Sequence, residues 1–218
     1  MAELVIMGPP QSSFVWATRI ATAQKGVPHR LEVALPHTPA VDAIHPLGRV
    51  PVMRHGDLAL CESRAIVSYV DSAFPGPRLQ ATDAVEAAKD EAWISLLCTG
   101  FDQVLVREYI LAYYFPGTPD GSPDKARIEA ALPKVKSQVA AIERAVVEGR
   151  LLGEAFRVPD AWLIPPLYYL RALPDWADIS AEAPATKAAL AKAAERDSVV
   201  STMPPPPSSA GSAEAAAE

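Results

Sequence analysis

The sequence predicts an α/β domain followed by an all-α helical bundle, and three observations lead to that prediction. In the first 75 residues, short apolar runs alternate with helix-like segments in the order β-α-β-α-β-β-α. A Phe-Pro-Gly-Pro break at 74–77 then interrupts this pattern. Beyond it, apolar residues from Trp93 to Tyr109 recur at about helical spacing. We therefore expect one domain at 1–75 and another at 83–203.

The first domain is predicted from its turn and cap residues. Gly8-Pro9-Pro10 ends the first strand, a serine at 12 or 13 suits the N-cap of the next helix, and Gly26 suits its end. The predicted elements are strands at 3–7 and 27–35, a hairpin at 50–61, helices at about 14–25 and 63–73, and a loop or short helix at 36–44. Two parallel strands joined by a crossover helix form a βαβ unit. The complete order is that of a thioredoxin-like domain.

The second domain is predicted to contain four helices and no strand. They are expected at about 83–115, 125–147, 157–170 and 184–196. Residues 204–218 are rich in Pro, Ser and Ala, and we expect this tail to be disordered.

Composition argues against several classes of function. The chain has 218 residues, 50% of them hydrophobic, and a formal net charge of −6. An acidic surface disfavours nucleic acid as a partner, and no apolar run has membrane-spanning length. Two cysteines without a C-x-x-C motif and four scattered histidines indicate neither a disulfide framework nor a metal site. The first seven residues are too short and too acidic for a signal peptide, so we expect a cytoplasmic protein.

The stretch from 45 to 66 contains the residues most suggestive of a binding site. Val50-Pro51 opens an apolar strand, and a proline there cannot donate to a sheet ladder. The backbone groups of Val50 are then free to pair with a ligand. Glu62-Ser63 precedes a helix, whose N-terminal N–H groups suit a carboxylate, while Glu62 can pair with an ammonium group. The stretch predicts a site for a small zwitterion bound in extended form.

The same stretch resembles the glutathione-binding half of cytosolic glutathione transferases. The family pattern is Asn-Pro-x-Gly-x-Val-Pro-x-Leu, a hairpin, and then Glu-Ser-x-x-Ile; it stands here at 45–53 and 62–66. His45 is a departure, because the family usually has Asn at that position. The resemblance covers about residues 3–203. It implies that glutathione is a co-substrate and that the protein is a homodimer.

The resemblance also implies which residues bind glutathione. They are His37, Arg49, Val50, Pro51, Glu62 and Ser63. The Val50 backbone would pair with the cysteinyl peptide, and Glu62 and Ser63 would hold the γ-glutamyl end. Arg49 or His37 would meet the glycine carboxylate, although a solvated loop histidine explains His37 equally well.

Catalysis would require a thiolate, because a thiol is mostly protonated at neutral pH. A hydroxyl donor beside the sulfur and a nearby helix N-terminus both stabilise the anion. By resemblance to the serine-type classes, Ser12 is the catalytic residue and Ser13 is the alternative. The pair followed by Trp16 is also similar to the Ser-Ser-Cys-x-Trp motif of the zeta class, with Phe14 in place of Cys. Either serine could instead serve only as a helix cap.

The second substrate is expected in an apolar cleft between the two domains. The candidate residues for this pocket are Phe101, Leu105, Tyr109, Tyr113 and Trp162, for which ordinary helix packing is the alternative explanation. The implied activity is attack of the activated glutathione thiol on an apolar electrophilic small molecule. A glutathione-dependent isomerase or peroxidase, or a non-catalytic glutathione-binding protein, remain alternatives.

The second domain departs from the family at a helix start. The family has a Ser/Thr-x-x-Asp capping box there. Asp160 keeps the acidic position, but Arg157 replaces the hydroxyl residue and cannot accept a bond from a helix N–H. We therefore expect Val158 to become the cap, with Pro159 at the first helical position.

Overall fold

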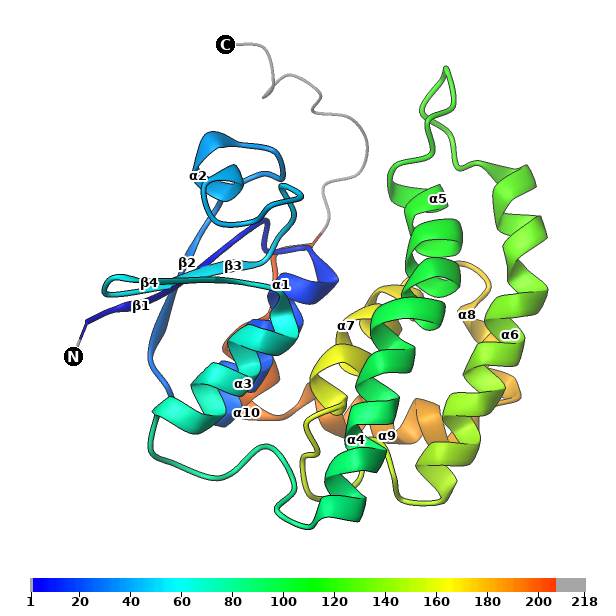
Figure 1. Ribbon diagram of the computed structural model, residues 1–218. Coiled ribbons are helices and arrows are strands. Elements are labelled where there is room, and N and C mark those ends of the chain that lie inside the picture. Colours follow the sequence, from blue (N-terminus) through cyan, green and yellow to red (C-terminus); the bar gives the residue numbers. More distant parts are fainter. Residues whose placement is uncertain (1, 207–218) are drawn as a thin grey trace.

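The computed structural model describes residues 2–206 and shows a mixed four-stranded sheet followed by a helical domain (Figure 1). The strands are β1 (Leu4–Met7), β2 (His29–Glu32), β3 (Val52–His55) and β4 (Leu58–Cys61), in the order β2-β1-β3-β4. Strand β1 pairs in parallel with β2 and antiparallel with β3, which pairs antiparallel with β4. The predicted fold class is confirmed.

Two helices lie among the strands, and the others follow one another after residue 62. They are α1 (Ser13–Gln24), α2 (Pro39–Asp42), α3 (Ser63–Ala73), α4 (Ala84–Leu96), η1 (Leu97–Ile110), α5 (Leu111–Tyr114), α6 (Lys125–Val147), α7 (Asp160–Leu170), α8 (Trp176–Ala181), α9 (Pro184–Ala194) and α10 (Asp197–Val200). The short helices α8 and α10 were not predicted. Figure 1 shows α1 and α3 between the sheet and the bundle. We infer that the domains meet within 74–83; most of the predicted tail lies outside the described residues.

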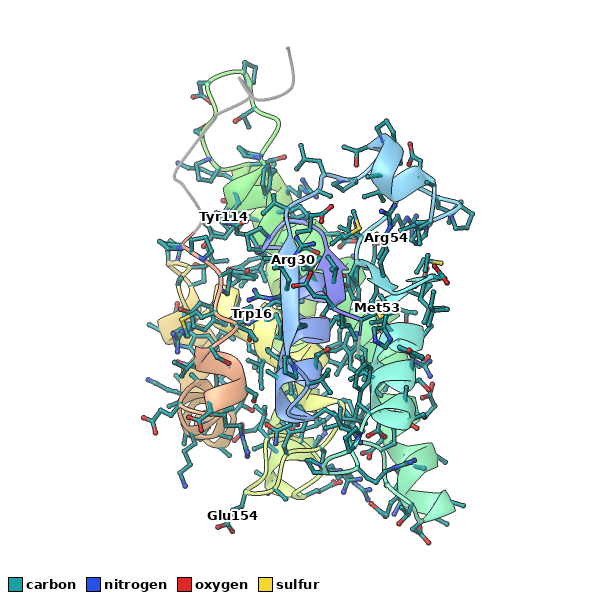
Figure 2. All side chains as sticks on the ribbon, turned by 90° about the vertical axis from the view of Figure 1, so that its left-hand side faces the viewer. Trp16, Arg30, Met53, Arg54, Tyr114 and Glu154 are labelled. Atoms are coloured by element: carbon teal, nitrogen blue, oxygen red, sulfur yellow. The ribbon has the colours of Figure 1, made fainter. Side chains whose placement is uncertain are left out.

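Helix α1 is buried on two sides. Val15 packs into the core under the sheet, whereas Trp16, Ile20 and Ala21 belong to the core of the helical domain. Trp16 is fully buried, and its indole N–H donates to Thr202 Oγ1 over 3.1 Å. In Figure 2, Trp16 is labelled near the middle of the view, whereas Glu154 projects from the lower end. The two domains therefore share this helix as part of both cores.

The helix predicted at 83–115 is continuous but not a regular α-helix. Its middle, η1, is a π-helix between α4 and α5. The apolar residues Trp93, Leu97, Phe101, Leu105 and Tyr109 are each four positions apart. This spacing exceeds the 3.6 residues of an α-helical turn, so the stripe would wind around a regular helix. The wider turns of i→i+5 hydrogen bonding keep it closer to one face.

The start of α7 corrects the predicted cap. Pro159, not Val158, occupies the N-cap position. The Asp160 carboxylate accepts N–H bonds from Leu152 (2.8 Å) and Arg157 (2.9 Å), and burial raises the pKa of Asp160 to about 6. The Arg157 side chain instead forms ion pairs with α4, 2.7 Å from Asp90 Oδ1. Arg157 therefore connects two helices at the position where the family has a capping hydroxyl.

A buried ion pair fixes the segment that leads out of the first domain. Lys25 Nζ lies 2.9 Å from Asp71 Oδ1, and both side chains are 1% exposed. Asp71 also accepts the N–H groups of Leu79 and Gln80. Burial opposes ionisation of Asp71, but these hydrogen bonds and Lys25 lower its pKa overall. The chain after α3 is thus held against the end of α1.

We expect Lys25→Met to lower the free energy of unfolding by roughly 3–5 kcal/mol, because the Asp71 carboxylate loses its buried partner. The remaining cation, Arg78, is 57% exposed and lies 3.6 Å from Asp71 Oδ2. Urea denaturation followed by circular dichroism would measure this loss. Arg150→Met is the matched control, since Arg150 pairs with Glu148 on the exposed surface and its loss should have little effect. Equal stability of the two variants would contradict a structural role for the buried pair.

Candidate active site

The sheet register brings three distant segments to one edge. Met7 lies opposite Val52 on β3, and Val52 lies opposite Cys61 on β4. The end of β1, the start of β3 and the end of β4 therefore adjoin. Gly8, at φ 151°, allows this closeness, because a Cβ there would lie 2.4 Å from Val15 Cγ2 and 3.1 Å from Val50 Cβ. The loop to Ser12, the Val50-Pro51 bond and Glu62 thus surround one region.

Ser12 is the N-cap of α1, but it caps the helix weakly. Its Oγ accepts the Val15 N–H over 3.5 Å, the outer limit of a hydrogen bond. The Ser12 hydroxyl is half-buried and retains its own proton for donation. Ser13 is the first residue of α1 and also half-buried. Both candidates thus lie at the positive end of the same helix.

The Val50-Pro51 bond is cis, and the adjoining backbone is unpaired. Within residues 2–206, neither the N–H nor the C=O of Val50 bonds another backbone group. His37, at φ 61°, donates its N–H to Gly48 O over 2.9 Å. This bond holds His37 beside Gly48, whose chain neighbour is the exposed Arg49. The geometry brings all three predicted loop positions together beside β3.

Helix α3 begins at this edge with a strained residue. Glu62 is the N-cap at φ 69°, a region that non-glycine residues seldom adopt. Its carboxylate is exposed but held, since Oε1 lies 3.2 Å from His45 Nε2. His45 Nδ1 accepts the Leu47 N–H over 3.0 Å, which assigns the ring proton to Nε2 and makes it the donor to Glu62. The buried imidazole therefore fixes the direction of this carboxylate.

Ser63 connects this edge to the helical domain. Trp162 Nε1 donates to Ser63 Oγ over 3.1 Å, and both side chains are 5% exposed. Because Ser63 Oγ accepts this bond, its own proton remains free to donate to a ligand. The N–H groups at the first turn of α3 also lack backbone partners. A carboxylate placed here would meet several donors at once.

Trp162 also lines a narrow pocket between the domains, which we call the interdomain pocket. Its volume is about 10 Å³, the room of roughly one water molecule. It is lined by Ser13, Phe14, Leu97, Phe101, Asp102, Leu105, Val106, Trp162 and Pro166. Five of these residues belong to η1, and π-helical segments frequently occur at functional sites. Three predicted pocket residues, Phe101, Leu105 and Trp162, are therefore brought together.

Two predicted pocket residues lie elsewhere. The hydroxyls of Tyr109 and Tyr113 both donate to Asp175 Oδ2, over 2.5 and 2.8 Å, and neither residue lines the interdomain pocket. Tyr109 is fully buried, so its position in the apolar stripe reflects packing.

Burial raises the pKa of the Cys98 thiol to about 12, which keeps it protonated at neutral pH. It therefore offers no thiolate at that pH.

Sequence reasoning gave no role to two residues that the structure places in the site. His45 was noted only as a departure from the family pattern, although its position at the start of the motif was a signal. Asp102 is buried in the interdomain pocket, where burial raises its pKa and Arg107 opposes the rise. An acidic residue directly after Phe101 in an apolar stripe could have indicated it.

The arrangement suits a peptide-like zwitterion whose middle residue lies near the start of α1. Unpaired backbone at Val50 can extend a strand, α3 can bind a carboxylate, and Glu62 can bind an ammonium group. Within residues 2–206, no group of three or more His, Cys, Asp or Glu is arranged to hold a metal ion. No helix in that range is both long and apolar enough to cross a membrane.

Comparison with known proteins identifies the family. Residues 7–78 match the model for the glutathione S-transferase N-terminal domain. Glutathione S-transferase 3 of Zea mays is 30% identical, over 96% of this chain and 99% of that protein. A stringent starvation protein A homolog of Pasteurella multocida is also 30% identical, over 85% of this chain and 82% of its own.

A solved structure agrees with these sequence relatives. The theta class glutathione S-transferase of Xanthomonas axonopodis pv. citri, crystallised with glutathione bound, superposes with a TM-score of 0.79. It is 26% identical, and the match covers 93% of this chain and 97% of that one. With a shared fold over nearly the whole length and the motif at 45–66, this chain belongs to the cytosolic glutathione transferase family.

Proposed function

We propose that the protein is an enzyme that activates the thiol of glutathione for attack on a small apolar electrophile. The observation that carries this proposal is the single sheet edge where a weakly capping Ser12, the unpaired Val50 backbone and the α3 N-terminus meet. Membership of the family supports glutathione as the co-substrate. In this proposal glutathione lies along β3 with its sulfur at Ser12, and a homodimer is the expected assembly.

Thiol activation needs only a modest energy at this position. Lowering a thiol pKa by two units corresponds to about 2.7 kcal/mol. A hydrogen bond from the Ser12 hydroxyl to the sulfur is charge-assisted, and the N-terminus of α1 adds a favourable dipole. Together these contributions are of the required size.

The γ-glutamyl end has partners of both signs in this proposal. Its carboxylate would accept the Ser63 hydroxyl proton and the first N–H groups of α3. Its ammonium would pair with Glu62, which His45 holds in place. His37 and Arg49 remain the proposed partners of the glycine carboxylate, because they adjoin Gly48 at the far end of the extended peptide.

A second candidate is a glutathione-binding protein without transferase activity. One relative is named for stringent starvation and not for a reaction. An isomerase or a peroxidase would use the same bound glutathione. Turnover of aryl halides, maleyl-type isomers and hydroperoxides separates the enzymes, and retention on immobilised glutathione without any turnover supports the binder.

We expect Ser12→Ala to raise the pKa of the bound glutathione thiol by about two units. At pH values below the thiol pKa of the unaltered protein, kcat/KM should then fall about 100-fold. The ultraviolet absorbance of the thiolate, followed against pH, measures the first effect. Ser13→Ala is the matched control, with a smaller effect on this pKa. A full loss in the Ser13 variant and none in the Ser12 variant would transfer the role to Ser13.

Trp162→Phe removes one N–H and keeps an aromatic ring in the pocket. We expect the KM for glutathione to rise roughly 5-fold, as for loss of a single hydrogen bond, with the thiol pKa unchanged. Trp176→Phe, in α8, controls for general effects of the substitution. The idea fails if Ser63→Ala raises KM whereas Trp162→Phe does not.

His45→Ala should weaken glutathione binding several-fold, because Glu62 loses its only side-chain partner within the described residues. Calorimetry with glutathione and with its analogue lacking the amino group measures the effect. The analogue has no ammonium, so its affinity should be nearly the same for both proteins. An equal loss for the two ligands would show that His45 acts on something other than Glu62.

A further inference from the structure

The interdomain pocket contains one ionisable side chain among its lining residues, Asp102. The other walls are apolar, apart from the hydroxyl of Ser13. Asp102 is 8% exposed. A carboxylate in such surroundings is costly unless both of its oxygens have partners. The partners of Asp102 therefore indicate whether it serves packing or a ligand.

Only one oxygen of Asp102 has a partner within residues 2–206. Arg107 Nε donates to Oδ2 over 2.7 Å, and Oδ1 receives no hydrogen bond. Oδ1 is nevertheless not fully buried. In the described part of the chain, the fully buried side-chain atoms without a partner are Arg19 Nε and Gln138 Oε1. Asp102 thus lines the pocket with one carboxylate oxygen that no protein donor satisfies.

The charges around Asp102 do not complete its pairing. Arg107 is 52% exposed and is a neighbour on the same helix segment. Arg49, from the sheet domain, lowers the pKa of Asp102 through its charge but donates no bond to it. Burial acts in the opposite direction and raises this pKa. The pocket thus keeps an acceptor of hydrogen bonds whose second oxygen is unsatisfied.

We propose that Asp102 selects electrophiles that present a hydrogen-bond donor, such as a hydroxyl or ammonium group, and disfavours those with a carboxylate. This inference rests on the proposed transferase function and names the substrate class of the same site. A donor satisfies Oδ1, whereas an apolar group leaves it unpaired and a carboxylate adds a like charge in apolar surroundings. Sites built to hydrogen-bond a substrate discriminate strongly against analogues that lack the donor.

Three glutathione conjugates of similar size test the proposal on the full-length protein. S-(3-hydroxypropyl)glutathione carries a donor, S-butylglutathione is its apolar isostere, and S-(2-carboxyethyl)glutathione carries the disfavoured charge. Calorimetric Kd values should be roughly 5- to 10-fold lower for the hydroxypropyl than for the butyl conjugate. The carboxyethyl conjugate should bind more weakly than the butyl conjugate.

Two variants assign the preference to this residue. Asp102→Leu should abolish the preference for the hydroxyl group, and Asp102→Asn should relieve the penalty on the carboxylate while retaining an acceptor. Asp57→Asn, on the exposed turn between β3 and β4, is the matched control and should leave all three affinities unchanged. The ligand series on the unaltered protein remains decisive even if a variant does not fold.

The outcomes separate this assignment from the proposed function. Tight binding of all three conjugates with equal affinity, or a preference for the carboxylate, overturns the role of Asp102 alone. Persistence of the hydroxyl preference in Asp102→Leu also overturns it. Failure of all three conjugates to bind overturns the proposed function and the assignment with it.

Discussion

The structure depends on helix α1 being buried on two opposite sides. Val15 packs under the sheet, while Trp16 and Ile20 pack into the helical core. Two further bonds fix its position. Tyr169 donates its hydroxyl to Gln11 O, just before the helix, over 2.9 Å, and Arg19, in the middle of the helix, donates to Thr202 O over 2.8 Å. Ser12 therefore has a position fixed by the helical domain as well as by its own. Loosening either core would move the proposed thiol activator.

The Ser63–Trp162 bond gives the proposed site a second connection across the domains. One residue belongs to the α3 N-terminus and the other to the wall of the interdomain pocket. In the proposed arrangement, the group that holds glutathione and the group that contacts its reaction partner share one hydrogen bond. A single buried contact therefore joins the proposed glutathione site to the interdomain pocket.

Local signals in the sequence were sufficient for most of the fold. Gly8 marked the end of β1 and Gly26 the end of α1, because both adopt a positive φ that glycine tolerates. Ser12 marked the start of α1, because serine is a good N-cap. Periodicity predicted a helix through 97–110 but not its π-helical turns, since a repeat of four is ambiguous between two helix types. The short helices α8 and α10 left too few turns for any periodic signal.

The proposed site could be derived from the sequence where it consists of neighbours in the chain. Val50-Pro51 and Glu62-Ser63 are such cases, and the structure brings them to one edge. The contacts of His45 with Glu62 and of Ser63 with Trp162 span 17 and 99 positions. No local pattern encodes a pairing of that kind. Tyr109 was wrongly expected in the pocket for a related reason. The sequence pattern of an aromatic residue on a helix is the same whether the residue lines a pocket or contacts Asp175.

The shared helix α1 has a consequence for how the chain matures during synthesis. The sheet and α1 emerge from the ribosome first, and domains tend to fold as units in that order. Trp16, however, lacks its partners Tyr168, Tyr169 and Thr202 until the last part of the chain has been made. The nascent first domain therefore exposes an apolar helix face for most of translation. We expect the proposed thiol site to become functional only near the end of synthesis.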